Sequence, residues 1–95
     1  MKTSELKDIA LDRAVARCEG LSHRLHGHIP YSSDWAQGGP IIERERITAE
    51  WTGEDWMAYI RHDEEFFGPT PLIAAMRCYV ASKLGDDIEL PKELK

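Results

Sequence analysis

The stretch that most limits the fold of this chain is GPTPLIAAMRCYVASKLG, residues 68–85. Thr70 can cap a helix, and Pro71 suits its first position, where the missing N–H would have no helical partner. Gly85 suits the left-handed residue at which many helices end. Between them, apolar residues recur at three- and four-residue spacing: Ile73, Met76, Val80 and Leu84. The pattern predicts a helix over residues 70–84, and its apolar stripe needs a surface to pack against.

The first part of the chain predicts another helix, over residues 4–19. Ser4 is a suitable N-cap, and Gly20 is a natural stop. Apolar side chains repeat at helical spacing in between: Leu6, Ile9, Ala10, Ala14, Val15 and Cys18. This helix can supply part of the surface that the C-terminal helix needs.

Two runs of alternating apolar and polar residues predict strands at about 46–51 and 56–61, with a turn over residues 52–55. The predicted register pairs Trp51 with Trp56, Ala49 with Ala58 and Ile47 with Ile60. One face of the hairpin is then apolar, and the two helices can cover it. Because a two-stranded sheet is only marginally stable, we expect a third strand from residues 29–31, from residues 88–90 or from a second subunit.

These elements predict one α+β domain over residues 1–95, a small layered arrangement of helices and sheet. The order is an N-terminal helix, a long loop over residues 20–40, the antiparallel hairpin, the C-terminal helix and a tail over residues 86–95. Gly, Pro and Ser are frequent in the loop, and a turn of helix is expected only after Pro40. A loop this long in so small a domain usually has a function.

The loop contains the best candidate for a binding site. Two aromatic residues bracket hydroxyl groups and a carboxylate, so the rings can stack on a planar ligand while the polar groups bond its edge. An arginine of the C-terminal helix can neutralise an anionic group of that ligand. The alternative is that both aromatic side chains belong to the core and that Ser33 or Asp34 caps a helical turn. The candidate ligand-binding residues are Tyr31, Ser32, Asp34, Trp35 and Arg77.

Three histidines, His23, His26 and His28, lie close together in the same loop and are the candidate metal ligands. Zinc sites usually need three or four ligands on a scaffold, and no cysteine pair accompanies these histidines. We therefore expect no metal and no cofactor. Cys18 and Cys78 are expected to be buried free thiols. No nucleophile, phosphate-binding or metalloprotease motif occurs, so we expect no enzymatic activity.

The formal net charge of −5 argues against non-specific binding to nucleic acid. No apolar run approaches a membrane span, and the N-terminus lacks the apolar core of a signal peptide, so we expect a cytoplasmic protein that does not bind membranes. An acidic surface favours solubility, and it also suits a protein partner. The acidic residues cluster in three places: Glu43 to Asp55, Asp63 to Glu65, and Asp86 to Glu89.

Three segments of the sequence form long motifs: Ala10 to Gly20, Asp34 to Glu45 and Pro69 to Val80. They resemble the NinX-like phage proteins, a family without a known activity encoded by tailed phages and prophages of enteric bacteria. A more distant similarity, in Leu11-Asp12-x-x-Val15-Ala16, Tyr31-Ser32-x-Asp34 and Thr70-Pro71-Leu72, is to the phage ABA-sandwich domain, which implies a helix–sheet–helix arrangement.

The resemblance implies a phage accessory protein that acts in the bacterial cytoplasm. Since catalytic motifs are missing, our first hypothesis is non-enzymatic binding that counters a host process by sequestering a small nucleotide-like molecule. The alternative is an inhibitor or adaptor that binds a host or phage protein through its acidic surface. The short predicted sheet also suggests a homo-oligomer, in which a second subunit completes it.

Overall fold

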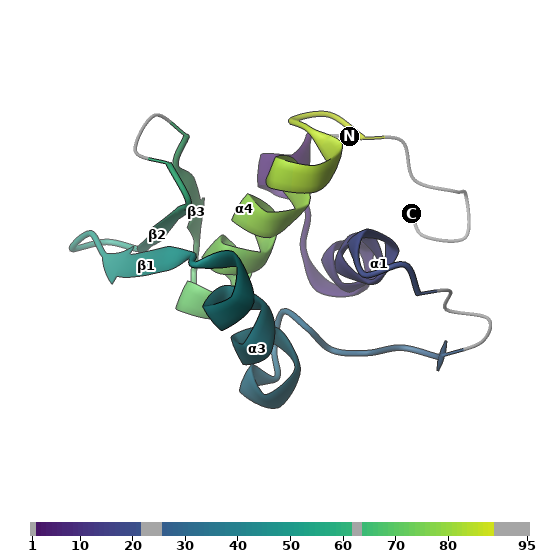
Figure 1. The fold of residues 1–95 in the computed structure, drawn as a ribbon. Helices are drawn as coiled ribbons and strands as arrows, with labels where there is room; N and C mark the ends of the chain where they lie inside the picture. Colours follow the sequence, from purple (N-terminus) through teal and green to yellow (C-terminus); the bar gives the residue numbers. More distant parts are fainter. Residues whose placement is uncertain (1, 22–25, 62–63, 89–95) are drawn as a thin grey trace.

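The computed structural model describes residues 2–21, 26–61 and 64–88, and it confirms the α+β class (Figure 1). A three-stranded antiparallel sheet has the order β1-β2-β3. The elements are the 3-10 turn η1 (Thr3–Glu5), the helices α1 (Asp8–Cys18), α3 (Trp35–Glu45) and α4 (Pro71–Leu84), and the strands β1 (Thr48–Trp51), β2 (Trp56–Tyr59) and β3 (Phe66–Gly68).

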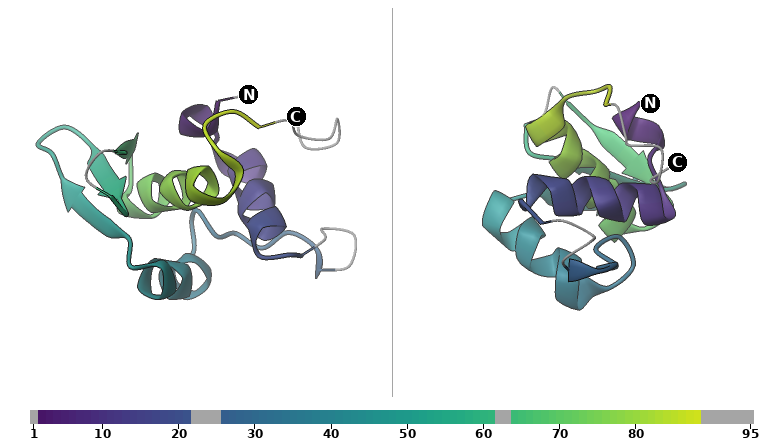
Figure 2. Two further views of the ribbon diagram at one scale, coloured as in Figure 1. Left: turned by 45° about the horizontal axis from the view of Figure 1, so that its top comes forward. Right: turned by 90° about the vertical axis from the view of Figure 1, so that its right-hand side faces the viewer.

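The helix predicted over residues 70–84 is α4, and it lies at the centre of the molecule. Thr70 caps it as expected, because its side chain accepts a hydrogen bond from the N–H of Ile73 at 3.0 Å. Gly85 ends it with φ +88°, a conformation that other residues rarely adopt. On one side α4 packs against all three strands, and on the other it packs against α1 and α3 (Figure 2). The apolar stripe of α4 is therefore part of a surface that is buried nearly all round.

The N-terminal helix is shorter than predicted, because residues 4–19 do not form one continuous helix. The chain makes one 3-10 turn, breaks at Leu6 and Lys7, and enters α1 at Asp8. Ser4 is therefore not the cap of α1. Leu6 has no exposed surface, and its carbonyl oxygen accepts a hydrogen bond from Arg77 Nε at 2.7 Å. The break thus lets Leu6 enter the core and directs its carbonyl group away from a helical partner.

The hairpin register is confirmed where the two strands pair, with Trp51 opposite Trp56 and Ala49 opposite Ala58. The Trp51 and Trp56 rings are in contact, with centroids 5.5 Å apart. The third strand is β3, which none of the three predicted sources supplies. A Cβ atom on Gly68 would lie 2.8 Å from the backbone nitrogen of Ala74, so only glycine allows β3 to approach α4 this closely. Residues 89 and 90 of the proposed tail strand lie outside the described residues.

The prediction of a loop through residue 40 is wrong, because α3 begins at Trp35. Asp34 caps this helix by accepting a hydrogen bond from the N–H of Ala36 at 3.0 Å. Pro40 lies inside the helix, and Gly38 is required by packing, since a Cβ there would come within 2.6 Å of Leu72 Cδ1. The glycines and the proline that suggested a loop are therefore compatible with a helix that lies very close to α4.

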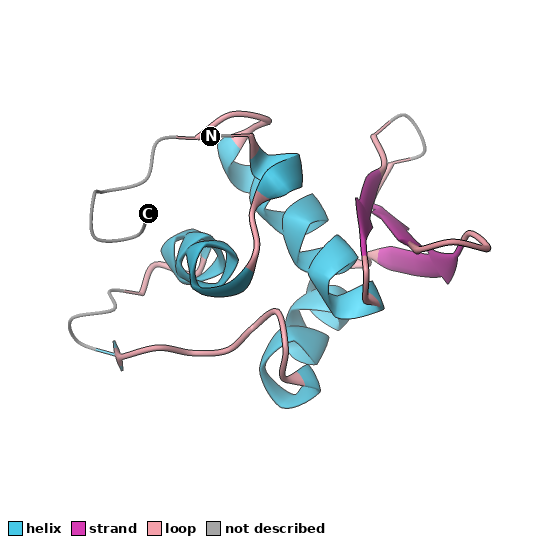
Figure 3. Ribbon diagram, turned by 180° about the vertical axis from the view of Figure 1, so that it is seen from behind, coloured by secondary structure: helices cyan, strands magenta, loops and turns pink. Residues whose placement is uncertain are grey.

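All the described helices lie on one side of the sheet (Figure 3). The layers are the sheet, then α4, then α1 and α3. This differs from the helix–sheet–helix order that the more distant resemblance implied, and from the prediction that two helices cover the hairpin, because α4 alone covers it. The other face of the sheet has no described helix over it and carries Thr48, Glu50, Met57, Tyr59 and Phe67.

Candidate functional site

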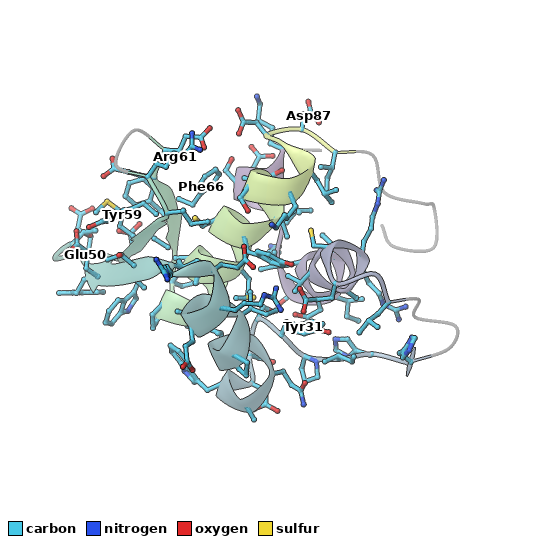
Figure 4. All side chains as sticks on the ribbon, viewed as in Figure 1. Tyr31, Glu50, Tyr59, Arg61, Phe66 and Asp87 are labelled. Carbon is cyan, nitrogen blue, oxygen red and sulfur yellow. The ribbon has the colours of Figure 1, made fainter. Side chains whose placement is uncertain are left out.

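The segment at Tyr31 and Ser32 is anchored to α1 by Asp12. Asp12 is 4% exposed, and its Oδ1 accepts hydrogen bonds from the Ser32 N–H at 2.8 Å and the Ser32 hydroxyl at 2.6 Å. His28 Nε2 lies 2.7 Å from Asp12 Oδ2. Tyr31 is 5% exposed and lies between α1 and α3 (Figure 4). The polar groups that were expected to face a ligand are thus used to fold the loop onto the helix.

The other candidate ligand-binding residues do not join Tyr31 in one cluster. Asp34 caps α3, while Trp35 is 55% exposed. Arg77 donates from Nε to the carbonyl of Leu6 and from Nη1 to the carbonyl of Phe67, each at 2.7 Å. Burial lowers the pKa of Arg77. The guanidinium therefore links Leu6, just after η1, to β3, and no hydrogen bond joins it to a described residue of the Tyr31 segment.

The described residues contain no group of three histidine, cysteine, aspartate or glutamate side chains arranged to hold a metal ion. His23 lies outside the described residues, and His28 is bonded to Asp12. Both cysteines are free, and burial raises the pKa of Cys18 and of Cys78 to about 11. These thiols are protonated near neutral pH, which makes them poor nucleophiles.

A charged network that no sequence pattern predicted joins the three described helices. Arg44 of α3 donates to both carboxylate oxygens of Glu19, at 3.0 and 2.7 Å, and also bonds Glu45. The Tyr79 hydroxyl of α4 donates to Glu19 as well. Hydrogen bonds from Arg44 are the largest cause of the lowered pKa of Glu19 and of Glu45. The members are up to 60 positions apart in the chain, so no local pattern reveals this network.

A surface hollow of about 460 Å³ lies between α4 and the end of β2. Its wall includes Phe66 and Cys78, and Phe66 points from β3 toward α4 (Figure 4). The charged residues around it carry both signs: Arg61, Lys83, Glu45 and Glu64. Because these charges balance, the hollow does not favour an ion of either sign.

Two further hollows, of about 440 and 350 Å³, lie beside β3 and share Ser4, Glu65 and Phe66 in their walls. We call them together the acidic groove. Carboxylates outnumber cations along it, because Arg77 and Lys2 are its basic residues. The acidic residues that line it are Glu54, Asp55, Glu64, Glu65 and Asp86. A positively charged partner suits this surface.

No described helix is long and apolar enough to cross a membrane. The described residues form a small α+β domain around one central helix, with an acidic groove and without a metal cluster. The chain matches the family model described as Bacteriophage P22, NinX over residues 25–83, more than half of its length, and it belongs to that family. It is therefore a phage-encoded accessory protein, as the resemblance implied. No curated protein matches the chain.

Proposed function

We propose that this phage protein acts without catalysis, by binding a basic segment of a host or phage protein in its acidic groove. The observation that carries the proposal is the continuity of the two hollows through Glu65, which lines both of them. Complementary charge mainly increases the rate of association and selects the partner. An inhibitor or adaptor needs both properties.

The groove carboxylates keep their charge available for a partner. The side chains of Glu54, Glu64 and Glu65 form no hydrogen bond or ion pair with another described residue. Arg77 forms no ion pair with a described carboxylate, and two of its N–H groups are held by backbone carbonyls. Phe67 is 44% exposed at the same place and supplies an apolar contact. A segment that combines lysine or arginine with an apolar side chain fits these features.

The experiment compares wild-type protein with Glu65→Lys and with Glu43→Lys, which alters an exposed carboxylate of α3 outside the groove. Each immobilised protein is exposed to an extract of phage-infected host cells at low salt, and retained proteins are identified by mass spectrometry. The proposal predicts a protein that wild type and Glu43→Lys retain and Glu65→Lys loses. The same retained proteins on all three would contradict it.

Sequestration of a small nucleotide-like molecule is a second candidate function. The exposed ring of Trp35 favours it, because a base could stack there without any rearrangement of the core. Thermal unfolding of wild type and Trp35→Ala with a panel of nucleotides tests this function. A ligand that stabilises wild type and not the variant would support it, and equal shifts in both would exclude stacking on Trp35.

A further inference from the structure

The hairpin turn shows which backbone groups of β1 point away from the sheet. Hydrogen-bonded and non-hydrogen-bonded pairs alternate along an antiparallel ladder. The Thr52 N–H donates to the Asp55 carbonyl at 2.9 Å, so these two residues face each other across the hairpin. The next pair, Trp51 and Trp56, is then non-hydrogen-bonded, and so is the pair that contains Ala49. The N–H and C=O groups of Ala49 and Trp51 therefore point to the outer edge of β1.

The same alternation places the N–H and C=O groups of Phe67 at the outer edge of β3. There the carbonyl group already has a partner, and we call this the closed edge. Phe67 pairs with Met57, and its carbonyl accepts the hydrogen bond from Arg77 Nη1 at 2.7 Å. Pro69, the outward-facing residue after Phe67, has no N–H to offer. An added strand can therefore use neither the Phe67 carbonyl nor an N–H at position 69.

The edge of β1 has none of these protections. Neither Ala49 nor Trp51 forms a further backbone hydrogen bond with any described residue outside the sheet. Strand β1 contains no proline or lysine, the residues that commonly protect an edge. Trp51 is 56% exposed at its end. An open edge of this kind can bind another strand through its main chain.

We propose that β1 pairs antiparallel with β1 of a second copy of this chain, which joins two three-stranded sheets into one of six strands. The charges near the strand indicate this occupant and this direction. Arg46 precedes β1 and Glu50 lies near its end, and neither side chain bonds to another described residue. With Ala49 on the two-fold axis, Glu50 lies opposite Thr48 of the second copy. Arg46 of the second copy, the left-handed residue that ends α3, is only two positions before that Thr48. Two such attractive contacts then form in each dimer.

This pairing uses a different edge from the proposed protein-binding function. The acidic groove lies beside β3, and β1 is the opposite edge of the sheet. A dimer joined through β1 therefore presents two grooves on its outer sides. An experiment can therefore disprove the β1 dimer without disproving partner binding in the acidic groove, and the reverse.

The test measures the dimer dissociation constant of the full chain by sedimentation equilibrium. Glu50→Arg and Arg46→Glu should each weaken the dimer about tenfold, because each brings like charges of the two copies together near the ends of the paired strands. The double variant Glu50→Arg/Arg46→Glu should restore wild-type affinity, since both signs are exchanged in both copies. Glu43→Arg, a charge change on α3, should leave the constant unchanged.

A backbone variant supplies an independent readout. Ala49→Pro removes an outward N–H from an edge strand, a place where proline is tolerated in a folded sheet. We expect this variant to keep the circular dichroism spectrum of wild type and to be monomeric. A wild-type protein that stays monomeric at its highest attainable concentration would overturn the proposal. So would a double charge exchange that fails to recover the affinity, or a folded Ala49→Pro protein with unchanged affinity.

Discussion

The two edges of the sheet differ in how their outward backbone groups are used. At β3, a side chain from the central helix reaches the carbonyl of Phe67, and the same guanidinium also bonds Leu6. At β1, no described residue outside the sheet bonds the outward groups of Ala49 and Trp51. One arginine thus closes an edge and attaches the N-terminal turn to the sheet. A single side chain can therefore occupy one edge of a short sheet, while the other edge remains available for binding.

The largest effect is expected at the closed edge. Arg77→Met should lower the free energy of unfolding by about 3 kcal/mol, because two carbonyl groups lose charge-assisted hydrogen bonds. Chemical denaturation measures this change. Arg77→Lys is the control, since it keeps the charge and can bond one carbonyl at a time, and it should lose about half as much. Equal stability of Arg77→Met and wild type would show that the arginine does not hold the edge.

The contact between β3 and α4 gives the next largest effect. Gly68→Ala places a Cβ within 2.8 Å of the Ala74 nitrogen and should cost about 2 kcal/mol through displacement of the strand. Gly39→Ala is the matched control, because its Cβ would meet Trp35 at an ordinary 3.7 Å and alanine favours a helix. Denaturation of both variants distinguishes tight packing from a general effect of replacing glycine. A Gly68→Ala protein as stable as the control would contradict the packing.

The smallest change in stability is expected in the charged network that joins the helices, away from both edges of the sheet. The pKa of Glu19 in the folded protein is held below its ordinary value of 4.5, chiefly by hydrogen bonds from Arg44. A lowered carboxyl pKa stabilises the fold above the unfolded pKa, and this contribution is lost as pH falls through the folded pKa. Glu19→Gln should therefore be about 1 kcal/mol less stable than wild type at pH 7.

That stability difference should shrink steadily as the pH falls below 4.5, the ordinary pKa of Glu19. Thermal unfolding across this range measures it, with Glu43→Gln on the exposed side of α3 as the control. A difference independent of pH would mean that the charge of Glu19 does not stabilise the helices. The two sheet-edge variants, Arg77→Met and Gly68→Ala, should show no comparable dependence, which separates the network from the closed edge.

The sequence predicted those elements whose signals are local. Thr70, Pro71 and Gly85 defined α4, and period-two alternation defined the β1–β2 register. The start of α3 was missed because Pro40 and three nearby glycine and glutamine residues suggested a loop, whereas Asp34 and the contact of Gly38 with Leu72 decided the structure. Strand β3 was missed because three residues show no clear period.

The candidate site could be predicted only in part, for the same reason. The segment at Tyr31 was recognised as unusual, and the sequence could not show that Ser32 would bond a carboxylate 20 positions earlier. Arg77 was selected for its charge, yet its contacts are Leu6, just after η1, and Phe67 of β3, which no local pattern connects. Contacts between distant residues decide where these side chains point. The acidic residues at 64 and 65 were recognised from composition, although their groove depends on the fold.

The most direct test of the contrast between the edges is amide hydrogen exchange measured at several protein concentrations. Pairing through β1 predicts that protection of the Ala49 and Trp51 amides rises with concentration, while that of Phe67 does not change. Concentration-independent exchange at both edges would contradict an open edge that binds a second copy. Rising protection at Phe67 instead would show that β3 is the edge that pairs, and that Arg77 does not close it.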